Sequence, residues 1–366
     1  MRLAVLEMKR AKLRFGLLTV AVALLIFLVL FLSTLSNALV SSLVGALNGL
    51  AADGLVYSDT ARNNIAASRL NPSTVQQVAA VPGVSTAGGI GTFTTNAIVG
   101  SQPAADAQIV GFTPGKPGAP TGLSSGRLPE APGEAAVDGS GIAVGDTITL
   151  QPTGQQLKVV GLMRGAQLNA ATTAYVTAQT YADEVTAANP GLPFVPLNAV
   201  AFDVAPGQDA ANVAAAVQQQ VPGTTAYTRA EAVALIPGID SIGQSFGILV
   251  GLTFVIGIVV IGFFFLILTV QKLKAFTLLR AVGASTRSLA ATVVWQITGV
   301  VLVASAFAAV LTWLAAQGLS TGIPVQLQPM VLISTVLAVL ICALGAGLLS
   351  VRRIARIDPA TAAGSR

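Results

Sequence analysis

Histidine is absent from this 366-residue sequence, and Cys342 is its only cysteine. The absence of histidine excludes a Ser–His–Asp triad, a histidine metal site and a histidine pH switch. A single cysteine can form neither an intramolecular disulfide nor a multi-cysteine metal site. Because Cys342 lies in an apolar run, we expect it to pack as a small, unreactive side chain.

Charge is also scarce, since 10% of the residues are charged and 53% are hydrophobic, whereas a soluble domain carries about 25% charged residues. Thirteen of the 15 acidic residues lie between Asp53 and Asp240, and 13 of the 20 basic residues lie outside that window. The net charge of +5 therefore reflects how the chain crosses a membrane. We expect no nucleic-acid partner.

Four apolar stretches are long enough to cross a hydrocarbon core of about 30 Å as helices. A cleavable signal peptide is the alternative for the first stretch, but its apolar run is too long and no clear A-x-A site closes it. Leu43, Leu47 and Leu50 keep helical spacing, so we expect the first helix to continue past the bilayer. The predicted transmembrane helices cover residues 15–50, 241–270, 289–317 and 328–350, with a neutral outer loop at 318–327.

The segments 1–14, 271–288 and 351–366 are basic, so the positive-inside rule puts all three in the cytoplasm. Residues 51–240 then lie outside the membrane. The predicted fold class is an integral membrane α-helical protein with four transmembrane helices and an α+β extracytoplasmic domain inserted between helices 1 and 2. We expect it in the bacterial inner (plasma) membrane, with both termini in the cytoplasm.

One unit, a strand, a helix, Val-Pro-Gly and a second strand, occurs twice in the outer segment and flanks its middle. The first copy has a strand at 54–60 and a helix at 73–80, and the second has a strand at 198–204 and a helix at 208–219. The similar sequences VQQVAAVPG and VQQQVPG link the copies. The alternative is two unrelated helix ends that share common turn residues.

The middle of the outer segment, residues 107–180, is rich in strand-like sequence. Its β-branched runs are short and are separated by Gly, Pro and Asp, which is typical of strands joined by turns. The predicted strands are AQIVGFT, EAAVD, DTITLQ, LKVVGLM and TAYVT. An α+β domain of this size needs no disulfide.

No pattern of residues predicts an enzyme. Gly115-Lys116 lacks the spacing and the Ser or Thr of a phosphate-binding loop, so Lys116 is expected in a turn. Glu130 with Glu134, and Asp183-Glu184 at the end of a predicted helix, could serve as carboxylate pairs. Because no nucleophile accompanies them, solvated surface is the preferred interpretation. We expect no catalytic residue, no bound cofactor and no metal on this chain.

Residues 271–288, QKLKAFTLLRAVGASTRS, form an amphipathic cytoplasmic connection. Its apolar residues, from Leu273 to Val282, recur at helical spacing, and its basic residues are accompanied by no acid. Gly283 can end this helix and Ser285 can begin the next. Such a helix offers a surface to a cytoplasmic partner, and the alternative is that its cations bind lipid phosphate.

The core of this connection, LLRAVGAST at 278–286, resembles the R-A-x-G-A-S core of the FtsX-like permeases, the membrane subunits of MacB-type ABC transporters. The basic N-terminus that runs into the first span resembles the same family. So do SGRLPEAPGEAAVDGSGIAVGDTITL at 125–150 and RRIARIDPATA at 352–362. Tyr57-Ser58-Asp59-Thr60 and the QKL sequence at 271–273 resemble the DevC-like branch of this family.

The resemblance implies that two permease copies pair and that each rests on a separate ABC ATP-binding subunit, which holds ATP and Mg²⁺. Residues 271–288 would be the coupling helix seated in a groove of that subunit. Many relatives carry Glu-Ile-Gly where this chain has Ala275, Phe276 and Thr277, so Phe276 is expected to make an apolar contact instead. The residues expected to carry ATPase coupling are Lys272, Phe276, Leu279, Arg280, Gly283 and Ser285.

The expected function is that of a permease subunit, which couples ATP hydrolysis on its partner to movement of its outer domain. Export or extraction of an amphiphilic or lipid-like substrate is the preferred role. Mechanotransmission to a cell-wall hydrolase, an envelope protein, is the alternative. A membrane-anchored scaffold without an ATPase is an alternative of another class, but it leaves residues 271–288 unexplained.

Overall fold

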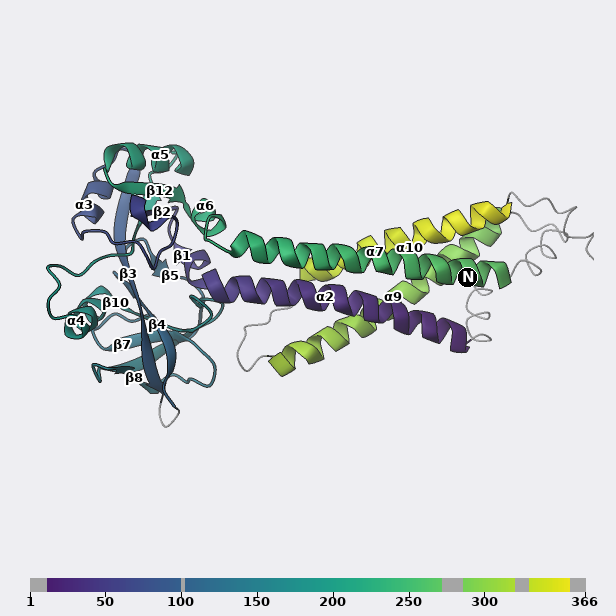
Figure 1. Ribbon diagram of the computed structural model, residues 1–366, viewed down its shortest axis with the longest axis horizontal. Coiled ribbons are helices and arrows are strands. Elements are labelled where there is room, and N and C mark those ends of the chain that lie inside the picture. The colour runs from purple at the N-terminus through teal and green to yellow at the C-terminus, as the bar shows by residue number, and fades with distance from the viewer. Residues whose placement is uncertain (1–11, 100–102, 272–285, 320–328, 356–366) are drawn as a thin grey trace, which may run out of the picture. The chain divides into compact units, whose positions relative to one another are not determined.

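The computed structural model describes residues 12–99, 103–271, 286–319 and 329–355 (Figure 1). These residues form two compact units. Described residues up to Asn37 and from Gln244 onward form the helical unit, and Ala38–Gly243 form the sheet unit. One element, α2 (Lys12–Asn48), contributes residues to both units.

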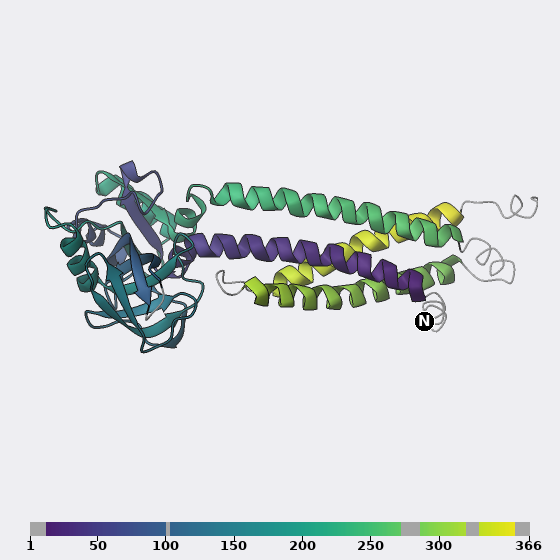
Figure 2. The same ribbon diagram turned by 60° about the horizontal axis from the view of Figure 1, so that its bottom comes forward.

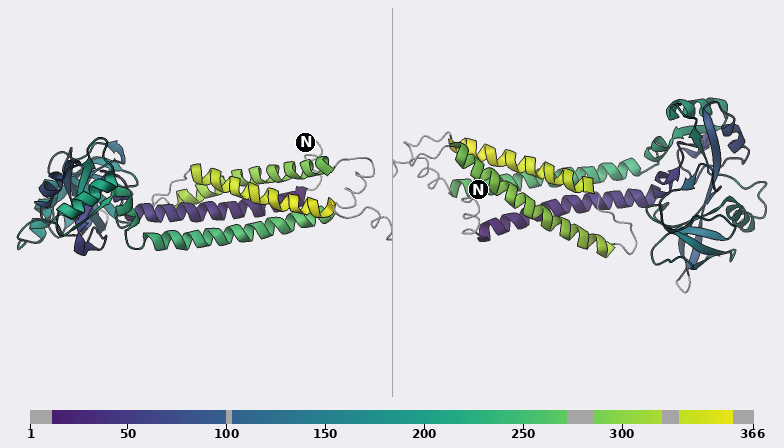
Figure 3. Two further views of the ribbon diagram at one scale, coloured as in Figure 1. Left: turned by 90° about the horizontal axis from the view of Figure 1, so that it is seen from above. Right: turned by 180° about the vertical axis from the view of Figure 1, so that it is seen from behind.

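The helical unit contains most of α2 together with α7 (Ile239–Gln271), α9 (Thr286–Leu319) and α10 (Pro329–Ala355). These helices run alongside one another in Figures 2 and 3. Their apolar side chains share one cluster, in which Ile26, Ile297 and Ala343 are fully buried.

Three helices in the described chain are long and apolar enough to cross a membrane. They span Phe15–Asn48, Ile239–Phe264 and Val293–Gln317, whereas the apolar part of α10, Pro329–Gly345, is shorter. The predicted helical continuation after Ser41 is confirmed as far as Asn48. The fourth span stays a prediction.

The two strand–helix–strand segments predicted from the sequence build one antiparallel sheet. The first segment is β2 (Gly54–Ser58), α3 (Thr74–Ala79) and β3 (Val84–Val99), and the second is β11 (Ala199–Val204), α5 (Ala210–Gln220) and β12 (Thr224–Thr228). Their strands lie in the order β12-β2-β11-β3, with each neighbouring pair antiparallel. This is the split β-α-β arrangement of ferredoxin-like units.

Alternating side chains cover both faces of this part of the sheet, as the pleat of a strand requires. Val56 and Val200 lie in a cluster with residues of α3 and α5. Leu55, next to Val56, lies in a second cluster with Leu47 of α2 and Ala232 of α6 (Arg229–Ala234). The sheet is therefore enclosed between α3 and α5 on one face and the end of α2 and α6 on the other.

The long strand β3 joins this part of the sheet to the β-rich middle (Figure 1). Its first residues pair with β11, and its later residues pair with β4 (Ala105–Phe112) and β8 (Thr147–Gln151). The strands predicted in the middle are confirmed as β4, β7 (Glu134–Asp138), β8, β9 (Gln156–Met163) and β10 (Thr172–Thr177). Helix α4 (Ala178–Ala188) follows β10, and the remaining short elements are β1 (Leu50–Ala51), η1 (Asp59–Ala61), β5 (Ala119–Pro120) and β6 (Leu123–Gly126).

Candidate functional site

The residues expected to couple to an ATPase, Lys272, Phe276, Leu279, Arg280, Gly283 and Ser285, lie outside the described residues. Two other places in the sheet unit have close packing together with buried polar groups. One is the attachment of the end of α2, and the other is a cavity beside α4.

The end of α2 is bonded to the loop 164–171 through backbone atoms. We call this loop, together with residues 42–46 of α2, the helix socket. Inside an α-helix, the backbone N–H and C=O groups normally bond to one another. Here, backbone groups of α2 also bond to the loop, which attaches the loop directly to the helix. The N–H to carbonyl bonds join Ala170 to Ser42 (2.7 Å), Asn169 to Leu43 (3.0 Å) and Ala46 to Gln167 (2.8 Å).

Glycine at position 45 allows the loop to approach this closely. A Cβ at Gly45 would lie 2.5 Å from the carbonyl oxygen of Gly165, which is a backbone atom that cannot rotate away. At the tip of the loop, Asn169 and Ala170 have φ values of 54° and 56°. Alanine rarely adopts this left-handed conformation, so the bonds to α2 help to maintain it.

Buried side chains of the sheet hold the loop from behind. Asp138 Oδ2 accepts a hydrogen bond from the Ala166 N–H at 2.6 Å, and the Tyr175 hydroxyl donates to the Ala166 carbonyl at 2.7 Å. Burial raises the pKa of Asp138, and N–H groups of Gly165 and Ala166 partly oppose that change. Side chains of strands β7 and β10 therefore hold the loop 164–171 in place.

Arg229 caps the end of α2. Its Nη1 donates to the Asn48 carbonyl at 2.8 Å and to the Leu50 carbonyl at 3.3 Å, and a cation is favourable at a helix C-terminus. Its backbone N–H also donates to the Asp53 carbonyl at 2.9 Å. Since Arg229 begins α6, the helix that precedes α7, it joins the end of α2 to the segment that leads into α7.

Glu134, in the stretch 125–150 that resembles the family motif, has a structural role. It forms an ion pair with Arg127 and accepts the N–H groups of Glu130 (3.1 Å) and Ala131 (3.2 Å). The bonds from Arg127 and Glu130 lower the pKa of Glu134 to about 2. Glu134 therefore closes the turn before β7, and its oxygens are already bonded.

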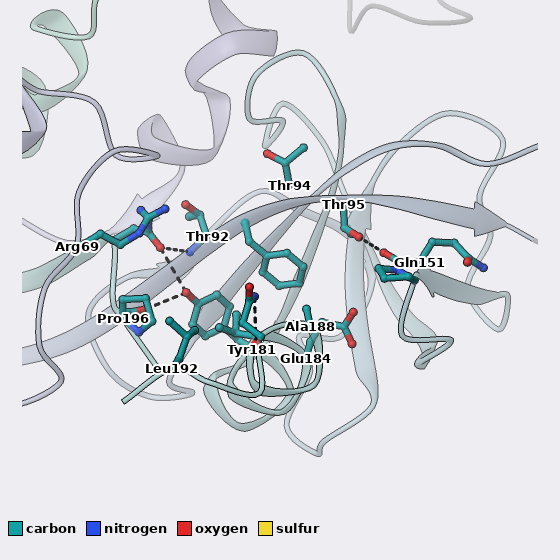
Figure 4. A pocket seen from close by; sticks show the side chains of 15 residues that line it. Arg69, Thr92, Thr94, Thr95, Gln151, Tyr181, Glu184, Ala188, Leu192 and Pro196 are labelled. Carbon is teal, nitrogen blue, oxygen red and sulfur yellow. Dashed lines mark hydrogen bonds between the residues drawn. The ribbon is translucent and has the colours of Figure 1, made fainter. Parts of the chain in front are cut away.

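A cavity of about 340 Å³ lies between α4, β3 and the β8–β9 turn (Figure 4). We call it the α4 cavity. Tyr181 lines it, and the Tyr181 ring lies over Gly91 and Gly111, which are paired across β3 and β4. The Tyr181 hydroxyl donates to the Pro196 carbonyl at 2.9 Å.

The burial of Glu184 is the largest departure from the interpretation based on sequence. This residue was expected on a solvated surface near the end of a helix, but α4 continues to Ala188 and Glu184 is only 2% exposed. The expectation is wrong because Glu184 lies on the buried face of α4, whereas its neighbour Asp183 is exposed. Sequence periodicity could have shown this, since Thr180, Tyr181, Glu184 and Val185 follow helical spacing.

The Glu184 carboxylate is only partly satisfied. Its Oε1 accepts from the Thr153 hydroxyl at 2.6 Å, and its Oε2 has no hydrogen-bond partner among the described residues. Within the same ranges, no three His, Cys, Asp or Glu side chains lie close enough together to hold a metal ion.

Known proteins similar to this chain include two groups of ABC transporter permeases. One is the "Putative hemin transport system permease protein HrtB" of Staphylococcus haemolyticus, 24% identical over 100% of this chain and 99% of its own. Another is an uncharacterised ABC transporter permease of Mycobacterium tuberculosis, 26% identical over 79% of this chain and 77% of its own.

Among solved structures, the periplasmic region of MacB from Actinobacillus actinomycetemcomitans aligns with 52% of this chain and 96% of its own, with 10% identity and a TM-score of 0.38. Two families match the sequence. Residues 247–359 match the FtsX-like permease C-terminal family, and residues 15–220, more than half of the chain, match the MacB-like periplasmic core domain. The chain therefore belongs to the FtsX-like permeases of MacB-type ABC transporters.

Proposed function

We propose that this permease couples ATP hydrolysis by a separate ATP-binding subunit to movement of its extracytoplasmic sheet unit. The observation that carries the proposal is that α2 is one helix of 37 residues with its last turns bonded into the socket. At about 1.5 Å per residue, this helix is about 55 Å long, well beyond a hydrocarbon core of about 30 Å. A continuous helix bonded at its far end can carry a displacement into the sheet unit.

The cytoplasmic end of this coupling is the segment 271–288, where the sequence pattern supports a docking helix. We propose that Phe276 and Leu279 contact the ATP-binding subunit and that Gly283 ends the helix. Lys272, Arg280 and Ser285 would assist at its polar face. ATP and Mg²⁺ would bind to the partner subunit. Gly283→Pro or Phe276→Asp should abolish co-purification with that subunit.

The proposed substrate class is an amphiphile that is handled outside the membrane. Residues 241–271 and 288–350 contain no Asp, Glu, Lys or Arg, and a carrier that is coupled to protons or ions usually needs ionisable groups within the bilayer. The Staphylococcus haemolyticus relative is named as a hemin transport permease. Hemin, an apolar ring with two carboxylates, is therefore the first substrate to test.

The experiment that tests this function interrupts α2 between its two ends. A Gly-Ser-Gly insertion after Asn37 would break the helix before the socket, and the same insertion after Gly191, in an exposed loop, is the control. In vesicles with the ATP-binding subunit, we expect the first insertion to keep ATP hydrolysis and to lose export of hemin. Normal export with the interrupted helix would contradict mechanical coupling.

A second copy of the chain is the proposed partner within the membrane. Helix α7 exposes many large apolar side chains, among them Ile248, Leu252 and Phe263. Gly243, Gly247 and Gly251 lie on α7 with open space where a Cβ would be, and small residues let two membrane helices pack closely. We propose that α7 contributes to a homodimer interface.

A further inference from the structure

We propose that the α4 cavity binds a small organic ammonium compound, with its cationic group against Glu184. This site does not rest on the proposed ATPase coupling, because the residues that line it lie neither in the segment 271–288 nor in the helix socket. The ligand class is inferred from the chemistry of the cavity walls.

The first observation is a buried carboxylate oxygen that lacks a donor. Glu184 is 2% exposed, lines the cavity, and leaves Oε2 without a partner among the described residues. A buried carboxylate is costly unless a cation or hydrogen-bond donors compensate it. In the described part of the chain, only the Thr153 hydroxyl, at 2.6 Å from Oε1, does so. A cationic donor would complete the pairing.

A second oxygen without a partner among the described residues belongs to Gln155, which does not line the cavity but contacts the same Thr153 as Glu184. The side-chain Oε1 of Gln155 is buried without a partner, and the Gln155 N–H contacts the same Thr153 hydroxyl at 3.4 Å. An alkylammonium group carries three N–H donors. Mg²⁺ and Ca²⁺ take six or more oxygen ligands, whereas the residues that line this cavity include one carboxylate, that of Glu184, so the site favours an ammonium group.

The other walls indicate an apolar body on the ligand. Phe93 and Tyr181 present aromatic rings with centroids 5.8 Å apart, and Val185 and Leu192 add aliphatic surface. A volume of about 340 Å³ is at the lower end of the range for small-molecule pockets. The cavity therefore suits one small ring or a short alkyl chain.

The charge at the far side of the cavity restricts the ligand further. Figure 4 shows Arg69 and Glu184 on opposite sides of the Tyr181 ring. The Arg69 guanidinium, which also donates to the Ala66 and Ser68 carbonyls, disfavours a second cationic group there. We therefore infer a monoammonium compound rather than a polyamine.

The test measures binding of benzylammonium, benzyl alcohol and benzoate to the full-length protein in nanodiscs by calorimetry, with protein-free nanodiscs as the blank. Of these three compounds, we expect benzylammonium to bind saturably and the other two not to bind. Glu184→Gln should weaken it at least about tenfold, because a hydrogen bond to a charged group is lost. Asp183→Asn, which removes an exposed carboxylate from the same turn of α4, should leave it unchanged.

Ala188→Phe provides a second variant that fills the cavity and keeps Glu184. It should also abolish binding, and amide exchange of β3 in both variants reports whether the sheet unit is folded. Equal binding of benzylammonium by the wild type and either folded variant would overturn the proposal. So would binding of benzyl alcohol as tight as that of the ammonium compound, or no binding above the blank.

Discussion

Gly45 of α2 faces Gly165 so closely that a Cβ at position 45 would be 2.5 Å from the Gly165 carbonyl oxygen. Gly45→Ala should therefore open the helix socket. Overpacking of this kind costs about 1–3 kcal/mol, against a gain of at most about 1 kcal/mol from the helix propensity of alanine. Amide exchange at Asn169 and Ala170, measured by mass spectrometry, should accelerate.

The control for this variant is Gly16→Ala on the same helix, where nothing lies within 4 Å of the added Cβ. Its amide exchange in the loop 164–171 should match that of the wild type. Unchanged exchange in Gly45→Ala would show that the loop does not depend on this contact.

Arg229→Ala should loosen the end of α2. The variant loses two hydrogen bonds to the carbonyls of Asn48 and Leu50 and a favourable charge at the helix C-terminus, which together contribute about 1 kcal/mol. We expect faster amide exchange in residues 46–53. Lys158→Ala removes an exposed cation from β9 and serves as the control, and equal exchange in the two variants would contradict a capping role.

The ion pair of Glu134 predicts a stability difference that disappears in acid. Its pKa is lowered to about 2, so its contribution is present above the unfolded-state value of about 4.3 and is lost as the pH falls through about 2. The wild type should exceed Glu134→Gln in melting temperature at neutral pH, and this margin should shrink between about pH 4 and pH 2. A margin that is constant with pH would argue against the pair.

Asp138 predicts the opposite dependence on pH. Burial raises its pKa, so the carboxylate opposes folding at neutral pH and this penalty disappears as the pH falls through the folded-state pKa. The melting temperature of the wild type, relative to Asp138→Asn, should therefore rise on acidification. Asp106→Asn, at an exposed carboxylate on β4, is the reference. A relative fall would contradict the assignment.

The homodimer can be tested by cysteine cross-linking, since Cys342 is the only cysteine to remove. In a Cys342→Ser background, Gly247→Cys should form a disulfide-linked dimer in membranes under mild oxidation, because position 247 lies on the open face of α7. Val293→Cys, at a buried position of α9, should not. Equal cross-linking of the two variants would argue against an interface on α7.

The elements of the sheet unit were largely predictable, because each strand and helix is encoded locally. The β-branched run LKVVGLM lies between turn residues and became β9, and the helix before each Val-Pro-Gly formed as expected. The length of β3 was not predictable, because its 16 residues pair with three different strands. Which strands pair depends on contacts between residues that are far apart in the sequence.

The socket was beyond sequence reasoning for the same reason, whereas the burial of Glu184 was signalled by helical spacing and missed. Gly45 gains its importance only from Gly165, far along the chain, and no local pattern joins them. Glu184 was assigned to the solvated surface because no nucleophile accompanies it in the sequence. In the structure it lies on the buried face of α4, where it accepts a hydrogen bond from the Thr153 hydroxyl.

The pairing of β12 with β2 has a consequence for biosynthesis. In this register Gly54 lies opposite Thr228, so the first long strand of the extracytoplasmic domain is completed by its last. Strand β2 therefore keeps one edge open until residue 228 has left the translocation channel, and an open edge can pair with other chains. A chain that ends before Thr224 would lack β12 and would keep that edge of β2 exposed.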